Sequence, residues 1–330
     1  MFWWLIVFIH FKEVKTVMNF FRIIVWSSLF VLILLFVFFD SGFDYQYVIP
    51  KRLLRLGAII VGGACVAFSA ITFQTITNNR IITPSIMGYE AVYLLFQSLL
   101  ILAFNASSQI VVSKHVNFIL AIIIMLMYSF MLQHWLLKNG RKPVFSLLLT
   151  GLVLTMVLTS FIQLIQFSIS PGEFAIFQSY SQATFNRVDA SQLIIAASMT
   201  FIICLILWHQ RRTFDVFSLG REQALSLGID DHRFIKFNLG LIAILVAIST
   251  SLLGPTAFMG VFVANLAYFF ANCARHSKIF FTGCVVAITS FLVAQLLVEH
   301  VFNYRITVGI LVNLLCAIYF LALILRPRSL

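Results

Sequence analysis

Charged residues are scarce in this sequence. Asp, Glu, Lys and Arg make up 10% of its 330 residues, 62% are hydrophobic, and the mean hydropathy is +1.03. A soluble domain averages about 25% charged residues. So few charges cannot cover a soluble surface, and we therefore predict an all-α polytopic membrane protein. The apolar runs lack the ten-residue alternation of an outer-membrane barrel, which favours spanning helices over strands.

Signatures of catalysis and of metal binding are also missing. The five cysteines lie in or beside apolar segments without a CxxC pair, and the seven histidines are scattered. The sequence contains no GxxxxGK phosphate loop, no HExxH pair and no GxSxG elbow. We therefore expect no enzyme activity, no metal site and no cofactor. The net charge of +11 does not indicate nucleic-acid binding, because basic residues in the loops of a membrane protein commonly set its topology.

Long apolar segments divide the chain. We predict ten spans, at about 21–39, 56–76, 86–104, 116–137, 144–169, 191–208, 235–254, 257–271, 279–298 and 305–325. The eighth is short, so nine spans or a re-entrant element is the alternative. No soluble domain fits between them. Residues 1–19 are interpreted as an N-terminal tail, with Met18 as an alternative start, and 20–330 as one transmembrane domain.

The distribution of basic residues gives an orientation. With both termini in the cytoplasm and ten crossings, 16 of the 22 Lys and Arg lie inside and 6 lie outside. The positive-inside rule supports this arrangement, which also places the 209–234 loop in the cytoplasm. Lys51, Arg52, Arg55 and Arg305 are exceptions on the outer side. They are either snorkelling side chains or a docking patch for an acidic partner.

Polar residues within the apolar segments are candidates for a transport path. Thr155, Thr159, Gln163 and Gln166 fall on one helical face. Such a stripe should face other helices or water rather than lipid, as packing contacts or as a path. Glu90 is the acidic residue well inside a segment, where a proton-relay role is the functional alternative.

A short element bounded by two glycines stands out in the 209–234 loop. It runs from Gly220 to Gly228, and Leu219, Gln223 and Leu227 share one face of the predicted helix. Gly228 is placed to end this helix in a left-handed conformation. The helix either lies on the membrane or fits a groove in a cytoplasmic partner.

Four stretches in order resemble the permease subunits of ABC importers for ferric siderophores, haem and vitamin B12, the FecCD type. They are Arg52 to Arg55 (R-L-P-R in the family), Gly63 to Gly88, Gly220 to Gly228 (G-E-x-x-A-x-x-L-G) and Gly254 to Val263 (G-P-I-G-F-V-G-L-I-V). The resemblance covers about residues 50–325. The departures, among them Leu54, Arg221, Leu225 and Ala264-Asn265, weaken the B12 alternative and look more like a ferric-siderophore subgroup.

The resemblance implies partners and residue roles. Two permeases, the same chain or a paralogue, would enclose a path for a ferric siderophore in the bacterial inner membrane, and separate ATPase subunits would hydrolyse ATP. A substrate-binding protein would dock outside on Arg52, Arg55 and Arg305. The residues implied to couple to the ATPase are Gly220, Glu222, Ala224, Leu227 and Gly228. The Thr155–Gln166 stripe would line the path.

Other functions stay open at this point. A proton-coupled secondary transporter with Glu90 as carrier is one alternative, and an ABC permease for haem or a corrinoid is another. A membrane-embedded enzyme or assembly scaffold would need a polar catalytic cluster, which the sequence does not offer.

Overall fold

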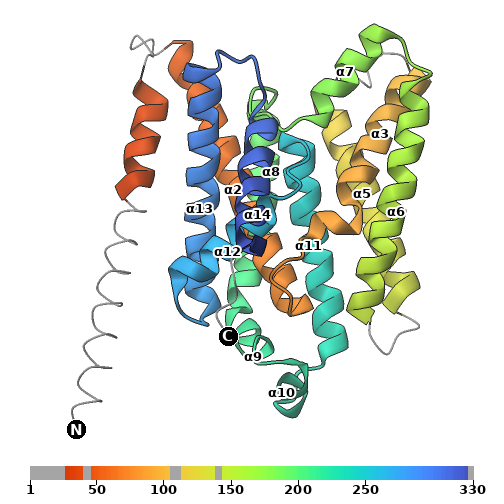
Figure 1. Cartoon of the computed structure of the whole chain (residues 1–330), viewed down its shortest axis with the longest axis vertical. Coiled ribbons are helices and arrows are strands. Elements are labelled where there is room, and N and C mark those ends of the chain that lie inside the picture. The colour runs from red at the N-terminus through yellow and green to blue at the C-terminus, as the bar shows by residue number, and fades with distance from the viewer. Residues whose placement is uncertain (1–26, 40–45, 105–112, 138–142, 326–330) are drawn as a thin grey trace.

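The computed structural model describes residues 27–39, 46–104, 113–137 and 143–325, and within these ranges the regular structure is helical (Figure 1). An apolar helix spans Ser27–Phe38. The following elements are α2 (Val48–Thr77), η1 (Pro84–Met87), α3 (Tyr89–Phe104), α5 (Lys114–Leu137), α6 (Pro143–Gln166), α7 (Pro171–Ser181), α8 (Ala190–His209), α9 (Arg211–Phe217), α10 (Arg221–Ser226), α11 (Asp231–Leu253), α12 (Met259–Ala271), α13 (His276–Leu296), η2 (Leu297–Val301) and α14 (Val308–Leu325).

The core forms around α2, which packs against α11, α13, α12 and α8. Small residues along α2 allow this, because a close approach of backbones stabilises helix pairs where lipid supplies no hydrophobic driving force. Phe68 of α2 stacks on Phe280 of α13, with ring centroids 4.6 Å apart. Among the long apolar helices of the described residues, α2 is the most buried, and it carries Arg52 and Arg55 in its first turns.

The ten predicted apolar segments each contain an apolar helix in the described part of the chain. Among the described residues, six helices are long and apolar enough to cross a membrane, and four other apolar helices are shorter. The number of crossings and the orientation of the termini stay predictions. Residues 1–26, which include the predicted tail, lie outside the described residues.

Helices α7 and α9 were not predicted as such, whereas α10 was. Helix α7 follows α6 directly and begins with a capping box between Ser170 and Glu173. Helix α9 continues α8 at Gln210, and α10 follows at Gly220. Figure 1 places α7 at the end of the molecule opposite to α10.

A short non-helical stretch, called the break below, separates α11 from α12. It explains why the eighth apolar segment is short. Gly254 ends α11 with φ +102°, a conformation that L side chains rarely adopt. A Cβ atom there would lie 2.8 Å from the carbonyl oxygen of Gln182, so the loop between α7 and α8 approaches this break closely.

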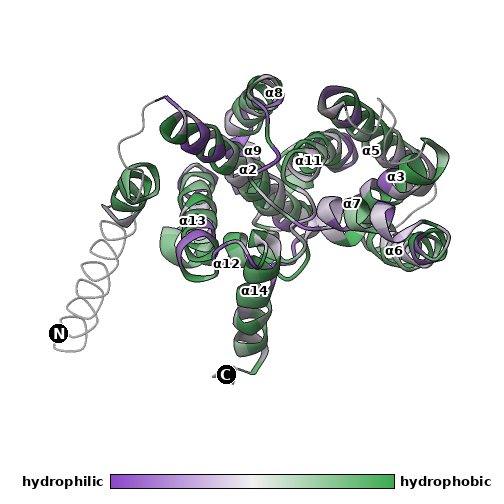
Figure 2. Cartoon of the chain, turned by 90° about the horizontal axis from the view of Figure 1, so that it is seen from above, coloured by the Kyte–Doolittle hydropathy of each residue, from purple (hydrophilic) through white to green (hydrophobic). Residues whose placement is uncertain are grey.

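Several peripheral helices expose apolar side chains. Only 11% of the residues in the most apolar stretch of α6, and 28% of those in α8, are buried within the chain. Seen from above, these helices and α14 lie at the periphery, with predominantly hydrophobic ribbons (Figure 2). Surfaces of this kind need lipid or another protein against them.

Candidate functional site

Two of the arginines predicted to lie on the outer side, Arg52 and Arg55, are in the first turns of α2, and Arg52 is buried rather than exposed. Its relative exposure is 5%. Its guanidinium donates to the carbonyl oxygens of Phe36, at 3.0 Å, and of Phe39, at the end of the preceding helix. It also forms a 3.0 Å ion pair with Glu299 of η2. Arg52 therefore joins three elements of its own chain, and its charge is largely compensated.

Arg55, one turn further along α2, is closer to solvent. It donates to the Tyr304 hydroxyl at 3.0 Å and lies 3.8 Å from the second carboxylate oxygen of Glu299. Burial raises the pKa of the Tyr304 phenol, and the adjacent Arg55 opposes that shift. Arg305 follows Tyr304 in sequence and is exposed. The structure thus brings Arg52 and Arg55 together with Glu299 and Tyr304 in one basic cluster.

The predicted cytoplasmic element forms a short helix, α10, at the tip of the structure (Figure 1). Both bounding glycines have positive φ, +122° at Gly220 and +82° at Gly228. Ala224 is fully buried, whereas Glu222 is exposed. Three leucines point out of this tip, each at least half exposed: Leu219, Leu225 and Leu227. An apolar tip on a polar loop is typical of a surface that another protein covers.

A buried polar network attaches this tip to the core. Asp215 of α9 accepts a 2.6 Å hydrogen bond from the backbone nitrogen of His276, which caps the start of α13. The same carboxylate oxygen lies 2.8 Å from His276 Nδ1. The other ring nitrogen of His276 lies 2.9 Å from the Thr75 hydroxyl at the end of α2. One histidine thus connects α9, α13 and α2.

The polar stripe lies along α6 as the spacing predicts, with different surroundings along its length. Thr155 is half-buried and donates to Gly151 O, close to the turn at Gly88. Thr159 and Gln163 are exposed on the surface of the single chain, and Gln166 is half-buried at the end of the helix.

Glu90 lies against the break between α11 and α12. One of its carboxylate oxygens accepts hydrogen bonds from the Thr256 backbone nitrogen and the Ser85 hydroxyl, each at 3.1 Å. It therefore ties the start of α3 to a stretch of non-helical backbone, which must be satisfied inside the protein at membrane depth.

The family assignment follows from comparison with known proteins. Residues 14–326 match the model of the FecCD transport family. The chain belongs to this family. Relatives include the petrobactin import system permease protein YclO of Bacillus subtilis, 36% identical over 89% of this chain and 93% of the relative. Another is the petrobactin import system permease protein FatC of Bacillus anthracis, 31% identical over 86% of this chain and 80% of the relative.

A solved structure supports the architecture. A metal-chelate type ABC transporter in an inward-facing conformation has a TM-score of 0.80, covering 92% of this chain and 97% of its own. At 18% identity, this likeness shows the fold alone.

Sequence reasoning missed the partners of the predicted site residues. Glu299 lies 247 residues from Arg52, and His276 lies 61 residues from Asp215. Neither pair belongs to a short motif. The only signal was chemical: an acid or a histidine at the end of an apolar segment needs a partner when it is buried.

Proposed function

We propose that this chain is the membrane-spanning subunit of an ATP-driven importer for ferric siderophores, with chelates of the petrobactin class as the first candidates. The observation that carries this proposal is α10, an exposed helix between two positive-φ glycines, in a chain 36% identical to a petrobactin import permease. We place the protein in the bacterial inner membrane. Haem or a corrinoid is the alternative cargo.

The ATPase would hold the tip formed by α10. Exposed Glu222 would offer the ATPase a negative charge, and exposed Leu227 an apolar contact. Buried Ala224 packs α10 against the rest of the permease. Gly220 and Gly228 supply the two backbone conformations that a side chain would oppose. Movement of the bound ATPase would then act on α9 and, through His276, on α2 and α13.

A substrate-binding protein would dock at the opposite end. Arg55 and Arg305 present positive charge there, and complementary carboxylates would steer the encounter. Arg52 contributes from below the surface, because its ion pair with Glu299 holds the cluster together. A docking carboxylate would compete with Glu299 for these arginines.

The cargo would pass between two permeases, either two copies of this chain or this chain and a paralogue. The exposed part of the α6 stripe, Thr159 and Gln163, would face that path, with Thr155 and Gln166 at its half-buried positions. Contacts that differ between inward-open and outward-open states would let ATP binding shift the balance between them.

Reconstitution in proteoliposomes tests the ATP dependence. We expect the permease with its ATPase and binding protein to import a ferric siderophore only with ATP, and Glu222→Arg to abolish import. Asp230→Arg reverses an exposed charge beyond the other end of α10 and serves as the control. Import that continues without the ATPase and stops with an uncoupler would instead support a proton-coupled transporter.

A further inference from the structure

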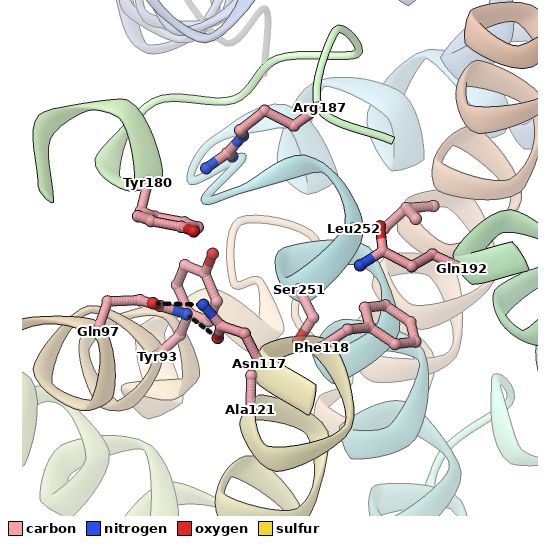
Figure 3. Close-up of a pocket in the computed structure, with 10 residues that line it drawn as sticks. All are labelled: Tyr93, Gln97, Asn117, Phe118, Ala121, Tyr180, Arg187, Gln192, Ser251 and Leu252. Atoms are coloured by element: carbon pink, nitrogen blue, oxygen red, sulfur yellow. Dashed lines mark hydrogen bonds between the residues drawn. The ribbon is translucent and has the colours of Figure 1, made fainter. Parts of the chain in front are cut away.

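A polar cavity of about 60 Å³ lies between α3, α5, α11 and the loop that joins α7 to α8 (Figure 3). The residues that line it are Tyr93, Gln97, Asn117, Phe118, Ala121, Tyr180, Arg187, Gln192, Ser251 and Leu252. In Figure 3, Arg187 and Tyr180 lie across the open space from the amides of Gln97 and Asn117. By the predicted topology this is the outer half of the protein.

Arg187, a half-buried side chain, brings a cation with incomplete hydrogen bonding to this cavity. Its Nη2 atom donates to the carbonyl oxygens of Leu253, at 3.3 Å, and Gln182, at 3.5 Å. Its guanidinium carbon lies 4.9 Å from the centre of the Tyr180 ring. The Nε and Nη1 atoms are buried and have no hydrogen-bond partner. Two donors of a cation are thus left unsatisfied.

A second unsatisfied group lies in the same wall. The Ser251 hydroxyl, near the end of α11, is buried and lacks a hydrogen-bond partner. The Gln97 and Asn117 amides, by contrast, satisfy each other through two hydrogen bonds of 2.8 and 3.1 Å. The unsatisfied polar atoms of the lining therefore come from Arg187 and Ser251, and both can donate.

Among the described residues that line the cavity there is no Asp or Glu. A buried charge without a counter-charge is costly, and more so at membrane depth. One water needs about 10–15 Å³ of such volume, so the cavity has room for about four to six waters. Water would satisfy the hydrogen bonds of the guanidinium but would leave its charge uncompensated.

We propose that this cavity is an anion-binding site in which Arg187 Nε and Nη1, helped by the Ser251 hydroxyl, hold a carboxylate or a halide. The positive charge of the lining, its free hydrogen-bond donors and the small volume of the cavity all favour a small anion. A whole iron chelate is too large, so a chelate could offer only one carboxylate arm. That last source rests on the proposed function, whereas the anion site itself does not.

An occupied site would also stabilise the outer loop. Thr184 N donates to Leu253 O at 2.9 Å, and Gly309 N donates to Ala183 O at 3.0 Å, so residues 183–187 join α11 to α14. An anion between Arg187 and Ser251 would add a bridge between the same loop and α11.

Bromide diffraction tests the site directly. Crystals of the purified protein grown in sodium bromide should give an anomalous peak within hydrogen-bond distance of Arg187 Nε and Nη1. Ordered water alone at that place, at molar bromide, would overturn the proposal. The measurement needs no transport activity, so its failure is distinct from failure of the proposed function.

Variants separate this site from general effects of salt. Bromide and acetate, titrated at constant ionic strength, should raise the Tm of the purified wild-type protein. Arg187→Gln should weaken the apparent affinity at least about tenfold, because a hydrogen bond to a charged group contributes roughly 1.5–3 kcal/mol. Ser251→Ala should weaken it less, and remains informative if the arginine variant does not fold.

A matched control is available in Arg80. Its guanidinium carbon lies 4.7 Å from the centre of the Tyr268 ring, similar to the stacking of Arg187 on Tyr180, but it does not line the cavity. Arg80→Gln should keep the wild-type anion dependence. An equal loss in both variants would mean that the effect is one of total charge and would contradict the site.

Competition identifies the source of the anion. If a chelate arm occupies the site, bromide should raise the KM for a carboxylate-bearing ferric chelate in wild type and not in Arg187→Gln. If the anion is a free ion, the KM should be insensitive to bromide while the Tm shift persists. If neither the Tm nor the KM changes with bromide or acetate, the proposal is overturned.

Discussion

At the scale of single residues, the pair between Arg52 and Glu299 is the shorter of the two ion pairs that Glu299 forms in the basic cluster. Both side chains are nearly buried, at 6% and 12% exposure, and their atoms are 3.0 Å apart. Removal of one partner should destabilise the protein by about 3–5 kcal/mol, because the other charge stays buried and unpaired. We expect Arg52→Met to lower the Tm of the purified protein strongly, and the double variant with Glu299→Met to recover most of the loss.

The exposed pair between Arg233 and Asp230 is the control. Its side chains are 88% and 53% exposed, and such pairs contribute about 0–1 kcal/mol. Arg233→Met should therefore leave the Tm almost unchanged. A loss in the Arg52→Met, Glu299→Met double variant as large as the sum of the two single losses would show that the pair does not act as a unit.

Substitution by Ala at two helical glycines should change the stability of the protein in opposite directions. A Cβ on Gly151 of α6 would lie 2.8 Å from the Met87 Cα, a backbone atom that cannot move aside, whereas a Cβ on Gly240 of α11 would meet nothing within 4 Å. Gly240→Ala should stabilise the protein by about 0.5–1 kcal/mol through helix propensity. Gly151→Ala should destabilise it.

Thermal unfolding of the two variants under identical conditions measures this difference. A Gly151→Ala protein as stable as Gly240→Ala would contradict the close packing of η1 on α6.

At the scale of elements, the contacts of α9 with α13 and α2 should determine how tightly ATP hydrolysis is coupled to import. Asp215 binds both the backbone and the ring of His276, which in turn contacts Thr75. Asp215→Ala should leave the permease inserted and bound to its ATPase, but lower the number of chelates imported per ATP hydrolysed. Parallel measurement of uptake and phosphate release in proteoliposomes gives this ratio.

Asp230 provides the matched control on the other side of α10. Its carboxylate caps the start of α11 by accepting from Arg233 N at 3.1 Å, but has no contact with the buried network. Asp230→Ala should keep the wild-type ratio. A similar ratio in both variants would mean that the His276 network only stabilises the fold.

Much of the helical arrangement could be predicted from the sequence, because hydrocarbon thickness and hydropathy constrain the apolar segments directly. Helix α10 was predicted from its two glycines, and the left-handed conformation predicted for Gly228 is confirmed by its φ of +82°. Helix α7 was missed because it is short and follows α6 after only a few residues. The break at Gly254 was anticipated only through the short segment after it.

The contacts of the candidate sites could not be predicted in the same way. Arg52 was interpreted either as a snorkelling side chain or as part of a docking patch, because charge and position alone do not reveal a partner 247 residues away. Glu90 was named from the sequence as a candidate proton carrier, and this alternative stays a prediction. Its hydrogen bonds to Thr256 and Ser85 could not be foreseen from the sequence. Long-range pairs of this kind depend on how α2, α13 and the loops meet, which hydropathy does not encode.

At the scale of the whole molecule, the exposed faces of the peripheral helices need different neighbours. Gln163 belongs to the stripe that we place on the path, whereas Phe161, two residues earlier on α6, points elsewhere and is 54% exposed. In a background without the five native cysteines, Gln163→Cys should react with a charged, membrane-impermeant thiol reagent. Phe161→Cys should not.

Equal labelling of the two cysteines would contradict a watery path along the stripe. Labelling of Gln163→Cys that decreases when the second permease is present would indicate a protein interface there instead.

The most direct test of the central claim is uptake of radioiron supplied as a panel of ferric siderophores. It would compare cells with the gene, cells without it and cells carrying Glu222→Arg. The account predicts that one chelate, with petrobactin the first candidate, enters only with the intact gene, and that the Glu222→Arg cells resemble the deletion while still inserting the protein. Uptake of every chelate that is unaffected by the deletion would contradict it.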